Sequence, residues 1–268
     1  MSRVNTVIKL GGSCVDELDD RWWDDLAENA RRTAVLLVHG WSRPLRSLDP
    51  AHGEPGAFLR DRYGNRSRYT TPAVIRDIRA VSGQIRAGIA RNLSARGIGV
   101  DQIVGSDGLL NTAAGERLWW RDGQLVEIDN LVGPIREVNV ERLAHRAADC
   151  VIVTPLASDP AGRTVNTDAD RAAAALAGAT GATDLVLVTD VSHFLVDGKP
   201  MTTLTPRLAA RHRDGTATGG MRKKLRAATE AIDHGVATVV LGSGTITDLL
   251  SGRSGTRITD HRTQGTSV

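Results

Sequence analysis

Short apolar segments that end in glycine recur along this chain, and they limit its fold more than any other feature. Residues 4–10, 34–38 and 236–241 are such segments, and glycine follows each of them within two residues. Amphipathic stretches with apolar side chains at helical spacing, such as residues 72–96, lie between them. The alternation of short buried strands with helices predicts an α/β protein with a central, mainly parallel sheet.

Local turn and cap signals add detail to this outline. Thr71 precedes Pro72, which predicts a helix that is capped by Thr71 and runs to about residue 96. An Asp-Gly pair inside residues 118–128 predicts a β-hairpin. Residues 53–69 are rich in glycine, arginine and aromatic side chains and are typical of a loop or hairpin, and residues 139–148 are expected to form a helix.

Several classes of protein are excluded by composition. No apolar window approaches the roughly 20 residues that cross a bilayer, so no membrane association is expected. Residues 1–6 lack the apolar core of a signal peptide. Cys14 and Cys150 are far apart and outside any CxxC motif, which argues against a disulfide framework and a cysteine zinc site. A reducing, cytoplasmic location is therefore expected.

Positive charge is concentrated in one part of the chain. The total charge is +3, but residues 43–96 contain eleven arginines and only four acidic residues, a net charge of +7. Such a surface suggests an acidic ligand, an acidic protein or nucleic acid. Aromatic residues make up only 3% of the chain, so few side chains are available to stack on bases, and nucleic acid is not expected as a partner.

Glycine-bearing turns after the apolar segments are candidates for binding an anion. Residues 9–13 (KLGGS), 39–42 (HGWS) and 242–245 (GSGT) are such turns. Glycine lets backbone N–H groups approach an oxyanion, and Lys9 adds a positive charge in a chain that contains only four lysines. Ligands of open parallel sheets bind at the carboxyl ends of the strands. Each turn could also be an ordinary strand-to-helix connection, and neither the P-loop nor the dinucleotide spacing is present.

Two further segments carry polar residues at the starts of predicted helices. Residues 164–170 (TVNTDAD) lead into an alanine-rich helix, where Asp168 or Thr167 could simply be the N-cap. Residues 219–224 (GGMRKK) open another helix, and lysine beside a helix N-terminus is unfavourable unless an anion binds there. A solvated basic turn is the alternative.

Taken in order, these pieces resemble the amino acid kinase family, and specifically its acetylglutamate kinase-like branch. The resemblance covers nearly the whole chain and rests on residues 7–13, 37–40, 68–72, 165–168, 188–191, 219–224 and 255–258. It implies a three-layer αβα sandwich, the carbamate kinase-like fold, with two lobes. Residues 1–180 would hold the acceptor and a dimerisation helix, and residues 181–268 would bind ATP. The resemblance also implies a homodimer through the helix at residues 72–96.

Residues 54–71 look more like the enzymes that act on an amino acid attached to a small acidic amino-group carrier protein of the LysW type. The basic character of residues 43–96 agrees with this independently, because an acidic carrier needs a basic docking surface. The resemblance therefore implies an ATP-dependent kinase of lysine or arginine biosynthesis that phosphorylates a side-chain carboxylate. The acceptor would be carrier-bound aminoadipate, glutamate or a precursor of a specialised metabolite. The alternatives are a kinase of free N-acetyl-L-glutamate and a non-catalytic, ligand-binding regulatory module.

The resemblance assigns roles to individual residues. Lys9 would bind the transferring phosphoryl group, Lys224 would neutralise the leaving ADP, and Asp168 would hold the two lysines. Mg²⁺ would be held mainly by the ATP phosphates, without a dedicated protein site. The remaining expected site residues are Gly11, Gly12, Gly40 and Trp41 for phosphate, Arg68 and Asn166 for the acceptor, Thr189, Asp190, Val191, Gly219, Gly220 and Met221 for the nucleotide, and Arg60, Arg62 and Arg66 for the carrier.

Two residues depart from the family pattern. Trp41 and His193 stand where glycine is usual. If residue 41 needed a positive φ angle, tryptophan would be strained there, and its ring would also fill space beside the phosphates. An altered acceptor is one possible consequence.

Overall fold

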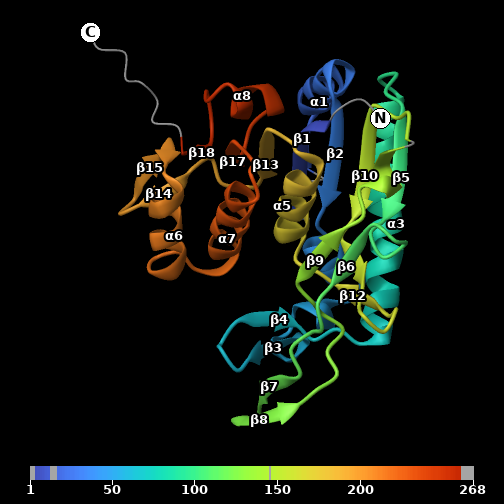
Figure 1. The fold of residues 1–268 in the computed structure, drawn as a ribbon, viewed down its shortest axis with the longest axis vertical. Coiled ribbons are helices and arrows are strands. Elements are labelled where there is room, and N and C mark those ends of the chain that lie inside the picture. The colour runs from blue at the N-terminus through green and yellow to red at the C-terminus, as the bar shows by residue number, and fades with distance from the viewer. Residues whose placement is uncertain (1–3, 13–16, 145, 261–268) are drawn as a thin grey trace.

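A single eight-stranded sheet forms the centre of the computed structural model, which describes residues 4–12, 17–144 and 146–260 (Figure 1). Neighbouring strands are parallel throughout, except for the antiparallel pair β17–β18. The strand order is β16 (Thr203–Leu204), β18 (Thr256–Ile258), β17 (Thr238–Gly242), β13 (Asp184–Val188), β1 (Val4–Leu10), β2 (Ala34–His39), β10 (Cys150–Thr154) and β5 (Val100–Val104). The predicted, mainly parallel sheet is confirmed.

Helices cover both faces of this sheet. On one face, α1 (Asp20–Arg32), α3 (Pro72–Ser94) and α8 (Ile246–Leu250) pack together, and on the other α5 (Ala169–Thr180) lies against α7 (Gly219–Asp233), with α6 (Pro206–Asp214) beside α7. All residues of β2, β10 and β17 are buried, because each strand is covered from both sides. The three-layer αβα architecture is confirmed.

Helix starts follow the predicted cap chemistry. The Thr71 hydroxyl accepts a hydrogen bond from the N–H of Val74 at 3.4 Å, and Pro72 is the first residue of α3. The Asp168 carboxylate caps α5 by accepting from the N–H groups of Asp170 and Arg171 at 3.1 and 3.2 Å. The fixed start of α5 determines the direction of its first side chains, including that of Asp170.

Two predicted hairpins join into one small sheet beyond the carboxyl ends of the central strands. It contains β3 (Phe58–Asp61), β4 (Arg66–Arg68), β7 (Leu118–Arg121) and β8 (Gln124–Glu127) in the order β4-β3-β7-β8 (Figure 1). Asp122 and Gly123 both have positive φ, 50° and 76°, as a two-residue hairpin turn requires. Leu59, Trp119 and Ile128 form a separate small core beneath it.

Several short strands were not predicted from the sequence pattern. A second small sheet, β12 (Thr164–Asn166), β11 (Leu156–Ser158), β6 (Leu110–Thr112) and β9 (Ile135–Val138), was not predicted, and neither was the hairpin of β14 (Phe194–Val196) and β15 (Lys199–Met201). Strands of three or four residues are too short to show a period. The helix expected over residues 139–148 is wrong in extent, since α4 is only Glu141–Ala144.

The predicted division near residue 180 does not separate two cores. Strand β1 pairs with β2 on one side and with β13 on the other, so strands from both sides of residue 180 form one sheet. It stays a prediction that residues 1–180 hold the acceptor and that residues 181–268 bind ATP. Among the helices of the described ranges, none combines the length and the apolar character that a membrane span requires.

Candidate active site

Two lysines and one aspartate meet below the surface at the carboxyl end of β1. The Nζ of Lys9, in β1, lies 2.7 Å from Oδ1 of Asp170, and the Nζ of Lys224, in α7, lies 3.3 Å from Oδ2 of the same carboxylate. The three side chains are only 8 to 11% exposed. Because α5 packs against both β1 and α7, its first turn brings Asp170 between the two lysines.

The prediction that Asp168 holds the two lysines is wrong, since Asp170 does so. The Asp168 carboxylate is occupied as the N-cap of α5, and its Oδ2 lies 3.2 Å from Nζ of Lys223 instead. Asp170 is two residues further on, inside the first turn, where its side chain faces β1. The sequence offered a partial signal, because Asp168 was also a candidate N-cap and a carboxylate used as a cap is not available to the sheet.

Electrostatics keep Asp170 charged despite its burial. Burial raises the pKa of the Asp170 carboxyl, but attraction and hydrogen bonds from Lys9 and Lys224 outweigh it and lower the pKa to about 2. Burial lowers the pKa of the Lys224 ammonium, and repulsion from Lys9 lowers it further, whereas Asp170 opposes both effects. The carboxylate therefore stabilises two ammonium groups that would otherwise repel each other.

Backbone contacts lock the two glycine loops next to this cluster. The N–H of Gly40 donates to the carbonyl of Leu10 at 2.9 Å, and the N–H of Gly11 donates to Val188 at 3.2 Å. A Cβ on Gly12 would lie 2.8 Å from the backbone nitrogen of Trp41, so only glycine permits this approach.

These bonds correct the expected phosphate donors. The N–H groups of Gly11 and Gly40 are already used within the fold, whereas those of Gly12 and Trp41 make no hydrogen bond inside the described ranges. Trp41 has φ −138°, so the expected strain at this residue is absent. Its ring is buried and meets the His39 ring edge-on, with 6.2 Å between centroids.

On the acceptor side, Thr70 links the segments that carry Arg68 and Asn166. The Nδ2 of Asn166, at the end of β12, donates to the hydroxyl of Thr70 at 3.2 Å. The N–H of Thr70 donates to Oδ1 of Asn130 at 2.7 Å. The structure therefore joins the segments that carry the two predicted acceptor residues. The sequence offered no signal for Asn130, which orders the chain just after Arg68.

Arg68 itself lies in a cationic, half-buried setting. It donates from Nη1 to the backbone carbonyl of His52 at 2.8 Å, and its guanidinium lies 4.9 Å from the centre of the Phe58 ring. The Arg66 guanidinium lies over the same ring at 3.6 Å. Burial lowers the pKa of the Arg68 guanidinium, and repulsion from Arg46 and Arg66 adds to the shift. An anion bound here would relieve that repulsion.

The predicted nucleotide residues belong to two segments. Thr189 to Val191 follow β13, where the N–H of Thr189 donates to Gly242 at 3.0 Å and Val191 is exposed. Gly219, Gly220 and Met221 form the start of α7, whose N-cap residue Thr218 makes no side-chain capping bond. An added Cβ on Gly219 or Gly220 would meet nothing within 4 Å, so this helix start is open. His193 is partly buried in the turn after β13.

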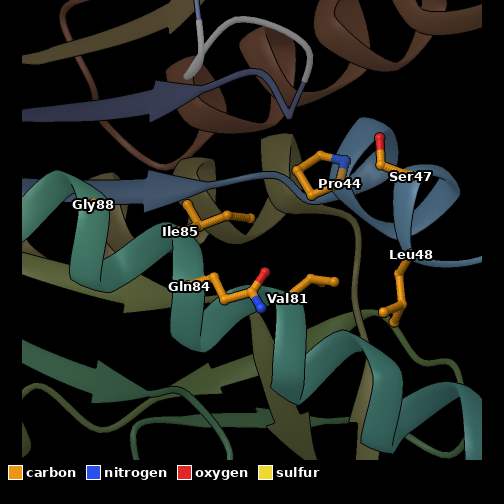
Figure 2. Close-up of a pocket in the computed structure, with 7 residues that line it drawn as sticks. All are labelled: Pro44, Ser47, Leu48, Val81, Gln84, Ile85 and Gly88. Carbon is orange, nitrogen blue, oxygen red and sulfur yellow. The ribbon is translucent and has the colours of Figure 1, made fainter.

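Three further observations limit the chemistry that the described residues can perform. Within residues 4–12, 17–144 and 146–260, no three His, Cys, Asp or Glu residues gather as a metal site would require. Cys150 is a buried thiol whose pKa burial raises to about 12, and Cys14 lies outside the described residues. A pocket of about 430 Å³ lies between α2 (Ser42–Leu48) and α3 (Figure 2), and no residue of the lysine cluster lines it. It contains no ionisable side chain, being lined by Pro44, Ser47, Leu48, Val81, Gln84, Ile85 and Gly88.

Replacing Asp170 by asparagine should destabilise the protein by about 3 kcal/mol at neutral pH, because two buried lysines lose their shared counter-charge. The pKa of Asp170 is lower in the folded protein than in the unfolded chain, so its contribution is complete above about pH 4 and is lost as pH falls toward about 2. Urea unfolding of wild type and Asp170→Asn at several pH values measures this difference.

Asp168→Asn is the matched control, since asparagine still caps a helix and the lysine pair keeps Asp170. Its effect on the free energy of unfolding should stay below about 1 kcal/mol. Equal losses in the two variants, or a loss in Asp170→Asn that does not change with pH, would contradict the assignment.

The chain is similar to several known proteins over most of its length. The profile of the amino acid kinase family matches residues 5–243. A putative [LysW]-aminoadipate/[LysW]-glutamate kinase of Nitrosopumilus maritimus is 32% identical over 88% of this chain and 91% of its own. The [LysW]-aminoadipate/[LysW]-glutamate kinase of Saccharolobus solfataricus is 32% identical over 89% of this chain and 92% of its own.

Solved structures show the same fold. The carbamate kinase of Giardia lamblia bound to AMP-PNP superimposes with a TM-score of 0.66 over 97% of this chain and 99% of its own, at 17% identity. The family match spans the glycine loops, the lysine cluster and the acceptor side that the geometry brings together. The chain therefore belongs to the amino acid kinase family and is an ATP-dependent phosphotransferase that uses a carboxyl group as acceptor.

Proposed function

We propose that this protein transfers the γ-phosphoryl group of ATP to the side-chain carboxylate of an amino acid attached to a small acidic carrier protein, giving an acyl phosphate. The relatives named as kinases of LysW-linked aminoadipate and glutamate support the carrier-bound acceptor. The observation that carries the phosphoryl transfer is the buried cluster of Lys9, Asp170 and Lys224 beside the glycine loops.

The chemistry needs charge stabilisation and no general base. An acceptor carboxylate is ionised at neutral pH, so its oxygen can attack the γ-phosphorus directly. A new oxygen–phosphorus bond forms as the bond to the bridging oxygen breaks, and ADP leaves with the electron pair. Lys9 stabilises the transferring group, Lys224 stabilises the leaving phosphates, and Asp170 keeps both ammonium groups in place.

The backbone supplies the remaining donors in this proposal. Gly12 and Trp41 have N–H groups that no other described group uses, and the open start of α7 at Gly219 and Gly220 has room for nucleotide phosphates. Mg²⁺ held by the nucleotide phosphates would neutralise part of their charge. Thr189, Asp190, Val191 and Met221 are proposed to line the nucleotide site.

Replacing Lys9 or Lys224 by methionine should lower kcat by about a hundredfold, because each variant loses one preorganised charge at the transition state. Methionine preserves the length of the side chain, and Asp170 keeps one lysine partner in either variant. The KM for ATP should change less for Lys9→Met than for Lys224→Met. Steady-state assays of acyl phosphate formation measure these effects.

Lys223→Met is the internal control for this pair. Lys223 is half exposed and bonds to Asp168 outside the buried cluster, so its loss should change kcat by less than about threefold. Near-normal turnover in Lys9→Met would refute the proposed transfer mechanism.

Fewer arginines are available to bind a carrier than the net charge of residues 43–96 indicated. Three of the eleven arginines of residues 43–96 are neutralised by acidic residues from outside that segment: Arg43 pairs with Glu17, Arg62 lies 3.0 Å from Glu116, and Arg96 pairs with two aspartates of α1. Of the three arginines predicted to dock the carrier, Arg62 is therefore the weakest candidate.

The other two arginines belong to one exposed row across the small sheet. Arg66 pairs with Arg60, Arg60 with Trp120, and Trp120 with Leu125, so the four side chains share one face. All four are exposed, Trp120 by 45% and Leu125 by 39%, whereas Leu59 and Trp119 on the opposite face are buried. We call Arg66, Arg60, Trp120 and Leu125 the docking row.

The docking row leads toward the acceptor site. Phe58 is two residues from Arg60 in β3, and Arg66 and Arg68 both lie over its ring. An acidic protein with an apolar spot could bind the row while its attached amino acid reaches Arg68 and Asn166. A free acetylated amino acid would have no use for exposed Trp120, and this observation favours the carrier over free N-acetyl-L-glutamate.

Charge reversal in the docking row should slow turnover of the carrier-bound acceptor. Arg60→Glu and Arg66→Glu should each lower kcat/KM for that acceptor by at least about tenfold at low salt, because they oppose electrostatic steering. Added salt should lower the wild-type value as well, since the Debye length falls from about 10 Å at 0.1 M to about 3 Å at 1 M. The KM for ATP should not change.

Arg207→Glu makes the same charge change at an exposed residue of α6, outside the row, and should leave kcat/KM within about twofold of wild type.

Efficient, salt-insensitive phosphorylation of free N-acetyl-L-glutamate by wild type would favour the acetylglutamate kinase alternative. Binding of ATP without turnover of either acceptor would favour a regulatory module. The predicted homodimer through α3 and the cytoplasmic location stay predictions.

A further inference from the structure

A buried threonine hydroxyl connects helix α3 to the glycine loop after β2. Arg86, in the middle of α3, donates from Nη1 to Oγ1 of Thr154 at 2.6 Å. The Nε2 of His39 lies 3.0 Å from the same oxygen. His39 and Thr154 are the last residues of the neighbouring strands β2 and β10, and both are 0% exposed. None of these contacts belongs to the lysine cluster.

The partners of His39 determine where its proton lies. Its Nδ1 is 3.4 Å from the carbonyl oxygen of Gly40, which can only accept, so this contact is a hydrogen bond when the hydrogen is on Nδ1. Nε2 then accepts the hydroxyl hydrogen of Thr154, and Arg86 occupies a lone pair of that hydroxyl. Burial lowers the pKa of His39 to about 3, with repulsion from Arg86 and Lys9 adding to the shift, so the ring is neutral.

This proton arrangement fixes the orientation of one peptide group. The Gly40 carbonyl and the Trp41 N–H belong to the same planar, trans peptide and point in opposite directions. A carbonyl drawn toward His39 therefore turns the Trp41 N–H away from it. The Trp41 nitrogen lies over Gly12, 2.8 Å from the place of an added Cβ, and its N–H is one of the two proposed phosphate donors.

We propose that Arg86, Thr154 and His39 are positioning residues that hold the Gly40–Trp41 peptide with its N–H directed at the transferring phosphoryl group. This inference rests on the proposed function of the glycine loops. The three side chains do not touch the substrates. They act through the peptide, so a residue of α3 influences phosphoryl transfer although it lies outside the site.

Removing the Thr154 hydroxyl tests the kinetic consequence. Thr154→Val keeps the shape of the side chain and should lower kcat about tenfold. The loss is moderate because the Trp41 N–H is misdirected but still present. The KM for ATP should change less than about twofold. Thr154→Ser restores the hydroxyl and should recover most of kcat. Arg86→Met, at the half-buried end of the network, should show a smaller loss in kcat and serves as a second variant if Thr154→Val folds poorly.

A merely structural role would lower thermal stability without a selective loss of kcat, and then Thr154→Val and Arg86→Met would both turn over like wild type. That result would overturn the proposal. So would a Thr154→Ser variant that is no better than Thr154→Val.

Nitrogen-15 NMR of histidine-labelled protein tests the proton arrangement without any substrate. The His39 signal, assigned by its loss in His39→Gln, should show the neutral Nδ1–H tautomer from about pH 5 to pH 8, well above the ring's pKa. An Nε2–H tautomer in wild type would overturn the proposal. Because the spectrum needs no acceptor, it judges this network even if the carrier-bound acceptor proves wrong.

Discussion

The buried contact of two lysines with one aspartate is the interaction on which the site depends. Three elements that are distant in the chain meet there: β1 with Lys9, the first turn of α5 with Asp170, and α7 with Lys224. Without the carboxylate, two ammonium groups would be buried side by side at a cost of several kcal/mol. The same contact holds α5 and α7 against the sheet and concentrates positive charge where polyphosphate chemistry needs it.

Much of this architecture could be predicted from the sequence because its elements are long or strongly signalled. Continuous apolar runs indicated β2 and β17, and the Thr71-Pro72 pair indicated the start of α3. Strands β6, β11 and β12 were not predictable, because three residues cannot show a period and their pairing depends on tertiary contacts.

The candidate site was predicted at the level of segments and less well at the level of atoms. Asp168 and Asp170 are both acidic and lie two residues apart, and only the capping geometry of α5 shows which one reaches the lysines. Among the loop N–H groups, sequence cannot tell that those of Gly11 and Gly40 are used by the fold. The charge of residues 43–96 likewise overstated the free basic surface, because partners such as Glu116 and Asp20 come from outside that segment.

Phosphoryl transfer is proposed to occur between the lysine cluster and the glycine loops. A crystal structure with ADP, Mg²⁺ and tetrafluoroaluminate, a planar mimic of the transferring group, tests this most directly. We predict that the fluoroaluminate lies within hydrogen-bond distance of the Lys9 Nζ and the Trp41 N–H, with Asp170 still joining Lys9 to Lys224. A fluoroaluminate bound away from both donors, or one bound beside Asp168 with the Asp170 contacts broken, would contradict this location of the transfer.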